Sequence, residues 1–203
     1  MKRFNFIALH KEVEPHRNDV TEFDGELIPK SAAMIMSRLA TEVDSTVRFQ
    51  LYSHAIGECE LACMTAAAVK LAHAQFREFH DIASLKVYSQ ALVENGEVAA
   101  GVSRAKEALE LAILKQTCVN YAAENLVRQA IKTGSAEAVN EALDALADSV
   151  EVARKGDCAL EADWADEAEA LGADKELISW VRALAERYAS VRGRRDGRRR
   201  RDG

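Results

Sequence analysis

The chain has 203 residues, of which 48% are hydrophobic and 30% are charged, and its formal net charge is −6. This is the composition of a globular protein with enough residues for one substantial core, and it argues against a fibrous or largely disordered chain. No apolar run approaches the ~18–20 residues that cross a bilayer, so no membrane span is expected.

The remaining bulk features suggest an intracellular protein. The apolar part of the N-terminus is short and soon followed by charge, which is atypical of a signal peptide. The four cysteines lie on expected helices without dense disulfide spacing, and we interpret them as reduced, mostly buried thiols. We therefore expect a soluble cytoplasmic, or otherwise intracellular or virion-associated, protein.

Residues 1–30 differ from the rest of the chain. Phe4, Phe6 and Ala8 occupy alternate positions, as in a short strand. A polar stretch follows, with Pro15 and Pro29 near its ends. We predict an extended N-terminal arm that packs on the body or on a neighbouring subunit.

Helical periodicity begins near Ser31, and no proline follows Pro29. Proline removes a helical hydrogen bond and clashes with the preceding turn, so its absence favours helix. Apolar residues recur every three or four positions through residues 31–94. Gly57 interrupts this pattern, which predicts either two helices, 31–56 and 58–94, or one kinked rod.

Asn95-Gly96 predicts a helix end, because both residues tolerate the left-handed conformation. Residues 97–132 then repeat in steps of four and three, which predicts one long helix with a heptad seam. Leu109, Gln116, Val119 and Leu126 are the members that we assign to an oligomer seam. Gln116 is its one polar member, and such a residue often fixes register or oligomeric state.

Three shorter helices are expected after this seam. Thr133-Gly134-Ser135 ends one helix and caps the next, at 136–154. Lys155-Gly156-Asp157 repeats that pattern before a helix at 158–171, and Gly172 with Asp174 precedes a last helix at 175–190. The expected fold is all-α: a bundle of about five to seven long amphipathic helices over residues 31–191.

Residues 192–203 form a basic low-complexity tail that we expect to be disordered. Seven arginines against two aspartates give the tail a charge of +5, so residues 1–191 carry −11. Arginine binds phosphate as a fork, which makes the tail a candidate for nucleic acid, another polyanion or an acidic protein. The candidate binding residues are Arg192, Arg194, Arg195, Arg198, Arg199, Arg200 and Arg201.

A second constellation lies in residues 54–80, where a helix would bring His54 near Glu58 and Cys59 near Cys63. These four residues are a candidate metal or redox site. None of the five histidines follows a glutamate by three positions, which argues against the usual di-iron bundle motif. The alternative is two small buried thiols beside a solvated acidic face, and we expect no cofactor.

The sequence contains no Gly-x-Ser-x-Gly elbow and no His-Glu-x-x-His motif, and the glycines at 96 and 101 lack the lysine of a phosphate-binding loop. These absences favour a non-enzymatic protein without excluding a helical enzyme. We expect an oligomeric structural or assembly protein of capsid, nucleoprotein or scaffold type, with a nucleic-acid-binding tail. The alternatives are a metal or redox protein, and an adaptor or immunity-type protein with one protein partner.

Overall fold

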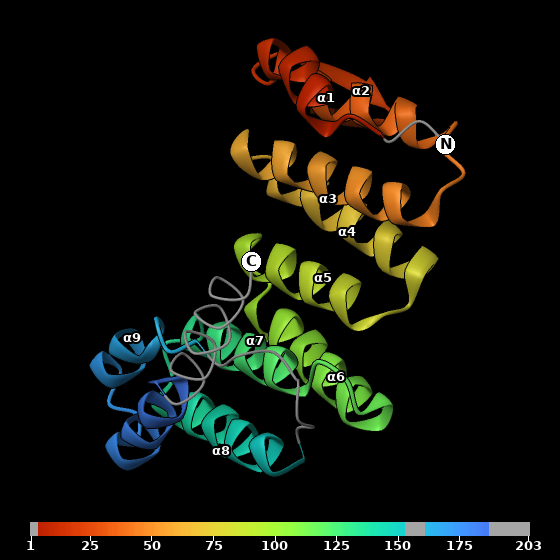
Figure 1. Ribbon diagram of the computed structural model, residues 1–203. Coiled ribbons are helices and arrows are strands. Elements are labelled where there is room, and N and C mark those ends of the chain that lie inside the picture. The colour runs from red at the N-terminus through yellow and green to blue at the C-terminus, as the bar shows by residue number, and fades with distance from the viewer. Residues whose placement is uncertain (1–3, 153–160, 187–203) are drawn as a thin grey trace, which may run out of the picture. The chain divides into compact units, whose positions relative to one another are not determined.

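The computed structural model describes residues 4–152 and 161–186, and the described part is almost entirely helical (Figure 1). The all-α class is therefore confirmed. The helices are α1 Phe6–Val13, α2 Lys30–Leu39, α3 Ser45–Leu61, α4 Thr65–Phe79, α5 Ile82–Glu94, α6 Val98–Lys115, α7 Val119–Ile131, α8 Ala136–Val152 and α9 Ala165–Ala170. Residues 175–186 are also helical, so the described residues hold more helices than the five to seven expected.

The chain divides into two compact units, Met1–Glu97 (unit 1) and Val98–Gly203 (unit 2). This differs from the three-part division that the sequence predicts, at residues 1–30, 31–191 and 192–203. No helix that the structure describes is long and apolar enough to cross a membrane. The tail at 192–203 lies outside the described residues.

The N-terminal residues of unit 1 are mainly folded, so the expectation of an extended arm is wrong there. The Asn5 side chain accepts a hydrogen bond from the amide of Ala8 at 3.0 Å and caps α1, whose Leu9 and Val13 are buried. Because these two residues are four apart, they share one helix face. A short 3₁₀ turn at Glu14–His16 leads to the antiparallel strands β1 Val20–Phe23 and β2 Glu26–Pro29.

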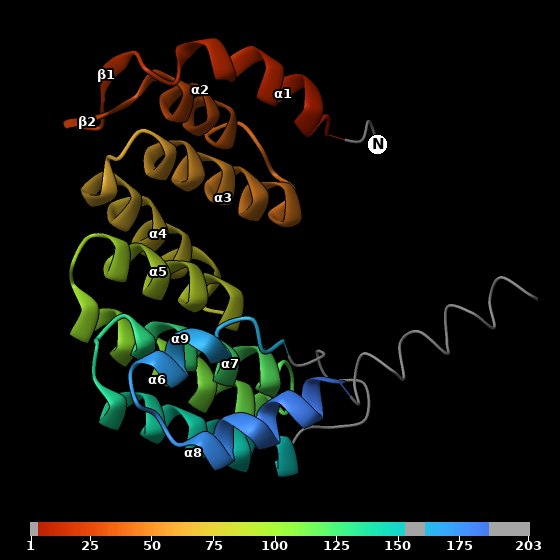
Figure 2. The same cartoon turned by 90° about the vertical axis from the view of Figure 1, so that its left-hand side faces the viewer.

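Unit 1 is a stack of successive helices with the hairpin beside it (Figure 2). The main helix contacts run from α2 to α3, α3 to α4 and α4 to α5, while β2 also contacts α2, α3 and α4. The core lies between these layers and includes fully buried Ile35, Leu51 and Ile56. The hairpin therefore contacts three consecutive helices of the stack.

The helix boundaries of unit 1 differ from those expected. Gly57 lies inside α3 and forms no joint. The chain turns instead near Asp44, at 62–64 and at His80-Asp81, where aspartate side chains cap α3 and α5. At two of these turns the residue with positive φ is not glycine but Cys63 at 57° and His80 at 48°, although glycine is the usual residue in this conformation.

Unit 2 is built around α7, which packs against α6 and α8. The expected single helix at 97–132 is wrong, because Gln116 and Cys118 adopt positive φ of 50° and 54° and reverse the chain. The seam residues Leu109, Val119 and Leu126 are buried within one chain, while Gln116 is exposed in the turn. A second copy is therefore not needed to account for the apolar pattern.

Other sequence-based boundaries are confirmed. Gly96, Gly134 and Gly172 all adopt positive φ just after helices. Ser135 accepts from the amide of Ala138 at 3.3 Å, and Asp174 accepts from the amides of residues 176 and 177. The stop expected at 155–157 lies outside the described residues.

Candidate functional site

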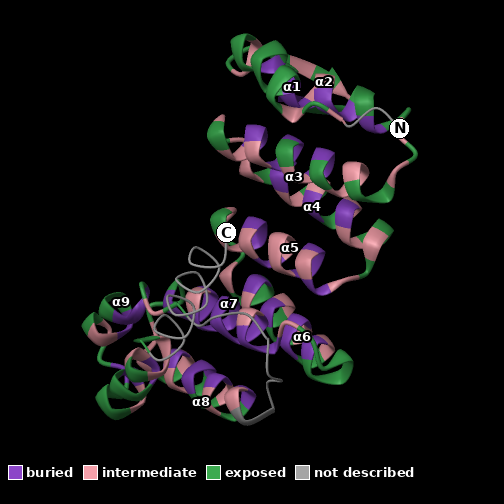
Figure 3. Cartoon of the chain, viewed as in Figure 1, coloured by how far each residue is buried: buried purple, intermediate pink, exposed green. Residues whose placement is uncertain are grey.

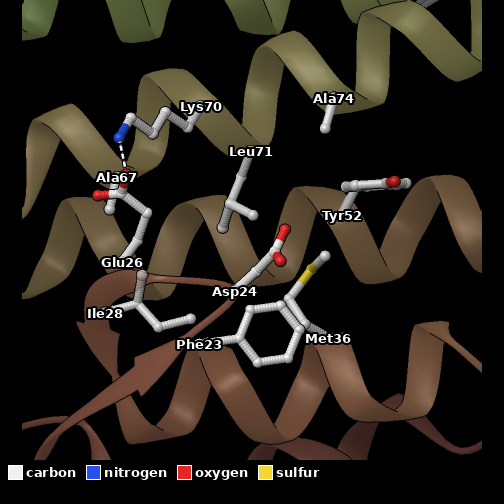
Figure 4. Close-up of a pocket in the computed structure, with 10 residues that line it drawn as sticks. All are labelled: Phe23, Asp24, Glu26, Ile28, Met36, Tyr52, Ala67, Lys70, Leu71 and Ala74. Carbon is white, nitrogen blue, oxygen red and sulfur yellow. Dashed lines mark hydrogen bonds and ion pairs between the residues drawn. The ribbon is translucent and has the colours of Figure 1, made fainter.

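A half-open cavity of about 480 Å³ lies in unit 1 between the hairpin and α2, α3 and α4 (Figure 4). Its size falls within the range of small-ligand and side-chain pockets. The walls are mostly apolar, and the polar groups come mainly from the hairpin and from α4. The lining residues are Phe23, Asp24, Glu26, Ile28, Met36, Tyr52, Ala67, Lys70, Leu71 and Ala74.

The hairpin turn determines which side chains of the two strands face the cavity. Asp24 and Gly25 have φ of 50° and 76°, the pair of left-handed residues that a tight two-residue hairpin requires. Phe23 pairs with Glu26 across the turn, and Ile28 follows two residues later on the same face. This alternation turns Phe23, Glu26 and Ile28 toward the cavity and leaves Leu27 on the outer face.

Most polar groups of the cavity are already engaged. Lys70 on α4 forms an ion pair with Glu26. The Tyr52 hydroxyl donates to the Glu78 carboxylate, and the pKa of Tyr52 is raised by burial and by that carboxylate. Within the described part of the chain, Asp24 has no ion-pair or hydrogen-bond partner for its carboxylate. Figure 4 shows this carboxylate projecting between Phe23 and Met36 on one side and Leu71 on the other.

The engaged tyrosine is held by a larger network. Arg48 donates to both oxygens of Glu78 at 2.6 and 2.8 Å, and it donates to the backbone carbonyls of Leu39 and Glu42. This arginine therefore joins the end of α2 to α4. The pKa of Glu78 is lowered, chiefly by the hydrogen bond from Arg48. The Tyr52 ring thus has a fixed position in the cavity wall.

A second hollow of about 430 Å³ adjoins the cavity. Its walls include Leu27, Cys63 and Met64, and it shares Glu26 and Ala67 with the cavity. Leu27 and Leu61, which lie near this end of unit 1, are 64% and 65% exposed. The two hollows are thus continuous along one side of the hairpin at Glu26 and Ala67.

The candidate metal residues are not brought together. Glu58 accepts from Arg17 through both oxygens at 2.8 Å, and that hydrogen bond chiefly lowers its pKa. Cys59 is buried, which raises its thiol pKa to about 12, whereas Cys63 is exposed. Partial burial lowers the pKa of His54. In residues 4–152 and 161–186, no three His, Cys, Asp or Glu side chains are placed to hold a metal.

Unit 2 contains a different polar cluster, on α7. Glu124 is 6% exposed and accepts a hydrogen bond from the backbone amide of Glu161. Burial raises the pKa of Glu124 to about 7, against the lowering effects of that amide and of Arg128. Arg128 in turn pairs with Asp163 and Glu161, so the segment from 161 to 164 covers the buried carboxylate.

The arginines of the tail, at 192, 194, 195 and 198–201, lie outside the described residues, and their predicted role stays a prediction. Asp24 is not among the residues predicted from the sequence, although Asp-Gly between two strand-like runs is a strong hairpin signal. No sequence motif marks Tyr52 and Leu71 as cavity residues, because they line the cavity only when separate helices stack.

The chain matches no protein-family model, and no curated protein or solved structure is significantly similar to it. Function is therefore inferred from the residues themselves.

Proposed function

We propose that the protein is a helical binding and assembly protein whose unit 1 holds an extended segment of a partner protein. The observation that carries this proposal is the half-open, apolar-walled cavity beside the hairpin, with the second hollow adjoining it at Glu26 and Ala67. Ligand sites are typically concave and mostly apolar, with a few polar groups that orient the ligand.

The surrounding framework supports this role. The successive stacking of α2, α3, α4 and α5 resembles the construction of helical repeat proteins, which commonly serve as frames for binding partners. The cavity wall is fixed by Arg48 and Glu78 behind Tyr52, so little ordering is required on binding. A preorganised site loses less conformational entropy when it is occupied.

An array of synthetic peptides probed with the full-length chain would test this function. Ala74→Phe places a ring in the cavity, and Ala99→Phe makes the same change at an exposed position of α6. We expect the wild-type chain and Ala99→Phe to bind a common set of peptides that Ala74→Phe loses. Failure of the wild-type chain to bind any peptide, or equal binding by Ala74→Phe, would contradict the proposal.

A second candidate function rests on the charge layout of the chain. Residues 192–203 carry +5 on a body of −11, and a cluster of arginines neutralises phosphates without sequence preference. We propose that this tail binds nucleic acid or another polyanion and that the protein assembles into oligomers. RNA and DNA binding should weaken in a chain ending at Val191, and equal binding by the two chains at low salt would contradict the role of the tail.

Light scattering of the full-length chain tests assembly. It should show a species larger than a monomer, and a clean monomer would contradict assembly.

A further inference from the structure

We infer that the cavity of unit 1 receives an arginine side chain of the bound peptide and that Asp24 selects its positive charge. This inference rests on the proposed function and names the chemistry of its partner. Three charged residues line the cavity: Glu26 is paired with Lys70, whereas Asp24 has no such partner in the described structure, so the lining carries one net negative charge. The cavity is therefore charge-complementary to a cation.

The apolar walls suit the rest of an arginine side chain. The stem of arginine is aliphatic and packs on apolar surface while its charged end remains at a polar group. Leu71, Met36 and Ile28 supply that apolar surface. A neutral apolar ligand would cover these walls but would also desolvate the Asp24 carboxylate without compensating it, which costs free energy.

The aromatic rings favour arginine over lysine. A guanidinium is planar, stacks on aromatic faces and donates two parallel hydrogen bonds to a carboxylate, whereas an ammonium acts as a point charge. Phe23 precedes Asp24 directly, and Tyr52 borders the cavity from α3. Tyr52 is 7% exposed overall, and its hydroxyl faces Glu78, so the part of its ring that lines the cavity is the part that meets a ligand.

The turn also prepares Asp24 for binding. Its backbone is fixed at φ 50° by the two-residue turn, and its short side chain has little rotamer freedom to lose. Asparagine is equally suited to this turn position. Asp24→Asn therefore removes the charge and preserves the hairpin, and Glu22→Gln removes a charge from the outer face of the same hairpin as a matched control.

Isothermal titration of the full-length chain would test the inference with three synthetic peptides. One carries a central arginine between leucines, the second carries lysine there, and the third carries citrulline, which has almost the same shape without the charge. We expect the arginine peptide to bind about tenfold more tightly than the citrulline peptide, with lysine between them. Asp24→Asn should abolish the preference, and Glu22→Gln should keep it.

The outcomes separate this inference from the proposed function. Equal binding of the arginine and citrulline peptides, lost in Ala74→Phe, would overturn the role of Asp24 and leave the cavity as a peptide site. A preference for arginine that survives in Asp24→Asn would also overturn it. No binding of any of the three peptides by the wild-type chain would overturn the inference, and the peptide array decides the proposed function independently. If Asp24→Asn unfolds with the same thermal midpoint as the wild-type chain, the substitution has left the hairpin intact.

Discussion

The two units use acidic side chains in opposite ways. In unit 1, the carboxylates of Glu58 and Glu78 each pair with an arginine of another segment, and Asp24 has no partner in the described structure beside an open cavity. In unit 2, the central helix α7 turns its polar residues inward, and Glu124 is enclosed under the segment that begins at Glu161. Figure 3 shows α7 coloured almost entirely as buried. A free carboxylate at a surface is available to a ligand, whereas an enclosed one instead makes stability depend on pH.

The largest expected loss of stability comes from truncating a buried leucine in the core of each unit. Leu51→Ala in α3 and Leu126→Ala in α7 remove fully or almost fully buried leucines, at 0% and 2% exposure. Each substitution should cost about 3 kcal/mol, through lost apolar burial and the space left behind. Urea unfolding followed by circular dichroism measures this, with tryptophan emission reporting on unit 2 through Trp164 and Trp180. A cost below about 1 kcal/mol would show that the site collapses around the smaller residue.

The next effect tests the ion-pair network of unit 1. Arg48→Met keeps an apolar stem but removes the donors to Glu78 and to two backbone carbonyls. We expect a loss of about 2 kcal/mol at pH 7, since hydrogen bonds to charged groups contribute strongly. The pKa of Glu78 is lower in the folded chain than in the unfolded chain. The ionised Glu78 therefore stabilises the fold at pH values above the ordinary pKa of glutamate, and this stabilisation is lost as the pH falls through the lowered pKa. The cost should therefore shrink in acid, and Arg38→Met, at a more exposed pair, is the control.

Glu124→Gln tests the enclosed carboxylate of unit 2. Its pKa is raised from 4.5 to about 7, so the folded chain binds this proton more tightly than the unfolded chain. That contribution is fully present below about pH 4.5 and is lost as pH rises through about 7. Glutamine keeps an acceptor for the Glu161 amide and carries no charge.

The variant should therefore be more stable than wild type by about 1–2 kcal/mol at pH 8 and nearly equal to it at pH 5. Chemical unfolding at the two pH values measures this difference, and Glu137→Gln on the exposed face of α8 should change neither value. A variant destabilised at pH 8 would contradict this account of Glu124.

The smallest effect concerns a feature that the two units share. Cys63 and Cys118 both adopt left-handed backbone just before a helix, with φ of 57° and 54°. Glycine reaches this conformation without steric cost, although it also loses more entropy on folding. We expect Cys63→Gly and Cys118→Gly each to raise stability by about 0.5 kcal/mol. Matched alanine variants should lack this gain, and a loss on glycine substitution would show that the cysteine side chain contributes packing.

These same turns explain what could be predicted from the sequence. The helical class was predictable, and so were the helix ends at Asn95-Gly96 and Gly134, because glycine stands where φ is positive. The turns at Cys63, His80 and Cys118 were not, because the apolar repeat continues on both sides of residues that rarely adopt this conformation. Gly57 led to the wrong prediction of a helix end, because glycine is also tolerated inside a helix. It has a helical conformation within α3, where a glycine lowers helix stability only modestly.

The candidate site was predictable only in its local part. Asp24-Gly25 is a turn signal within four neighbouring residues, and the alternation beside it assigns Phe23 and Ile28 to one face. The opposite wall, with Tyr52 and Leu71, depends on which helix faces which. Periodicity assigns a residue to a helix face but does not identify the neighbouring helix.

The order in which helices pack within each unit has a consequence for folding speed. In unit 1 the main contacts join α2 to α3, α3 to α4 and α4 to α5, and in unit 2 they join α6 to α7 and α7 to α8. Each closure spans a short loop, so little chain entropy is lost before native contacts form. Two helices that are adjacent in the sequence can therefore pack first and serve as a folding nucleus. The next helix then packs on a surface that is already formed. Chains of such low contact order characteristically fold within microseconds to milliseconds.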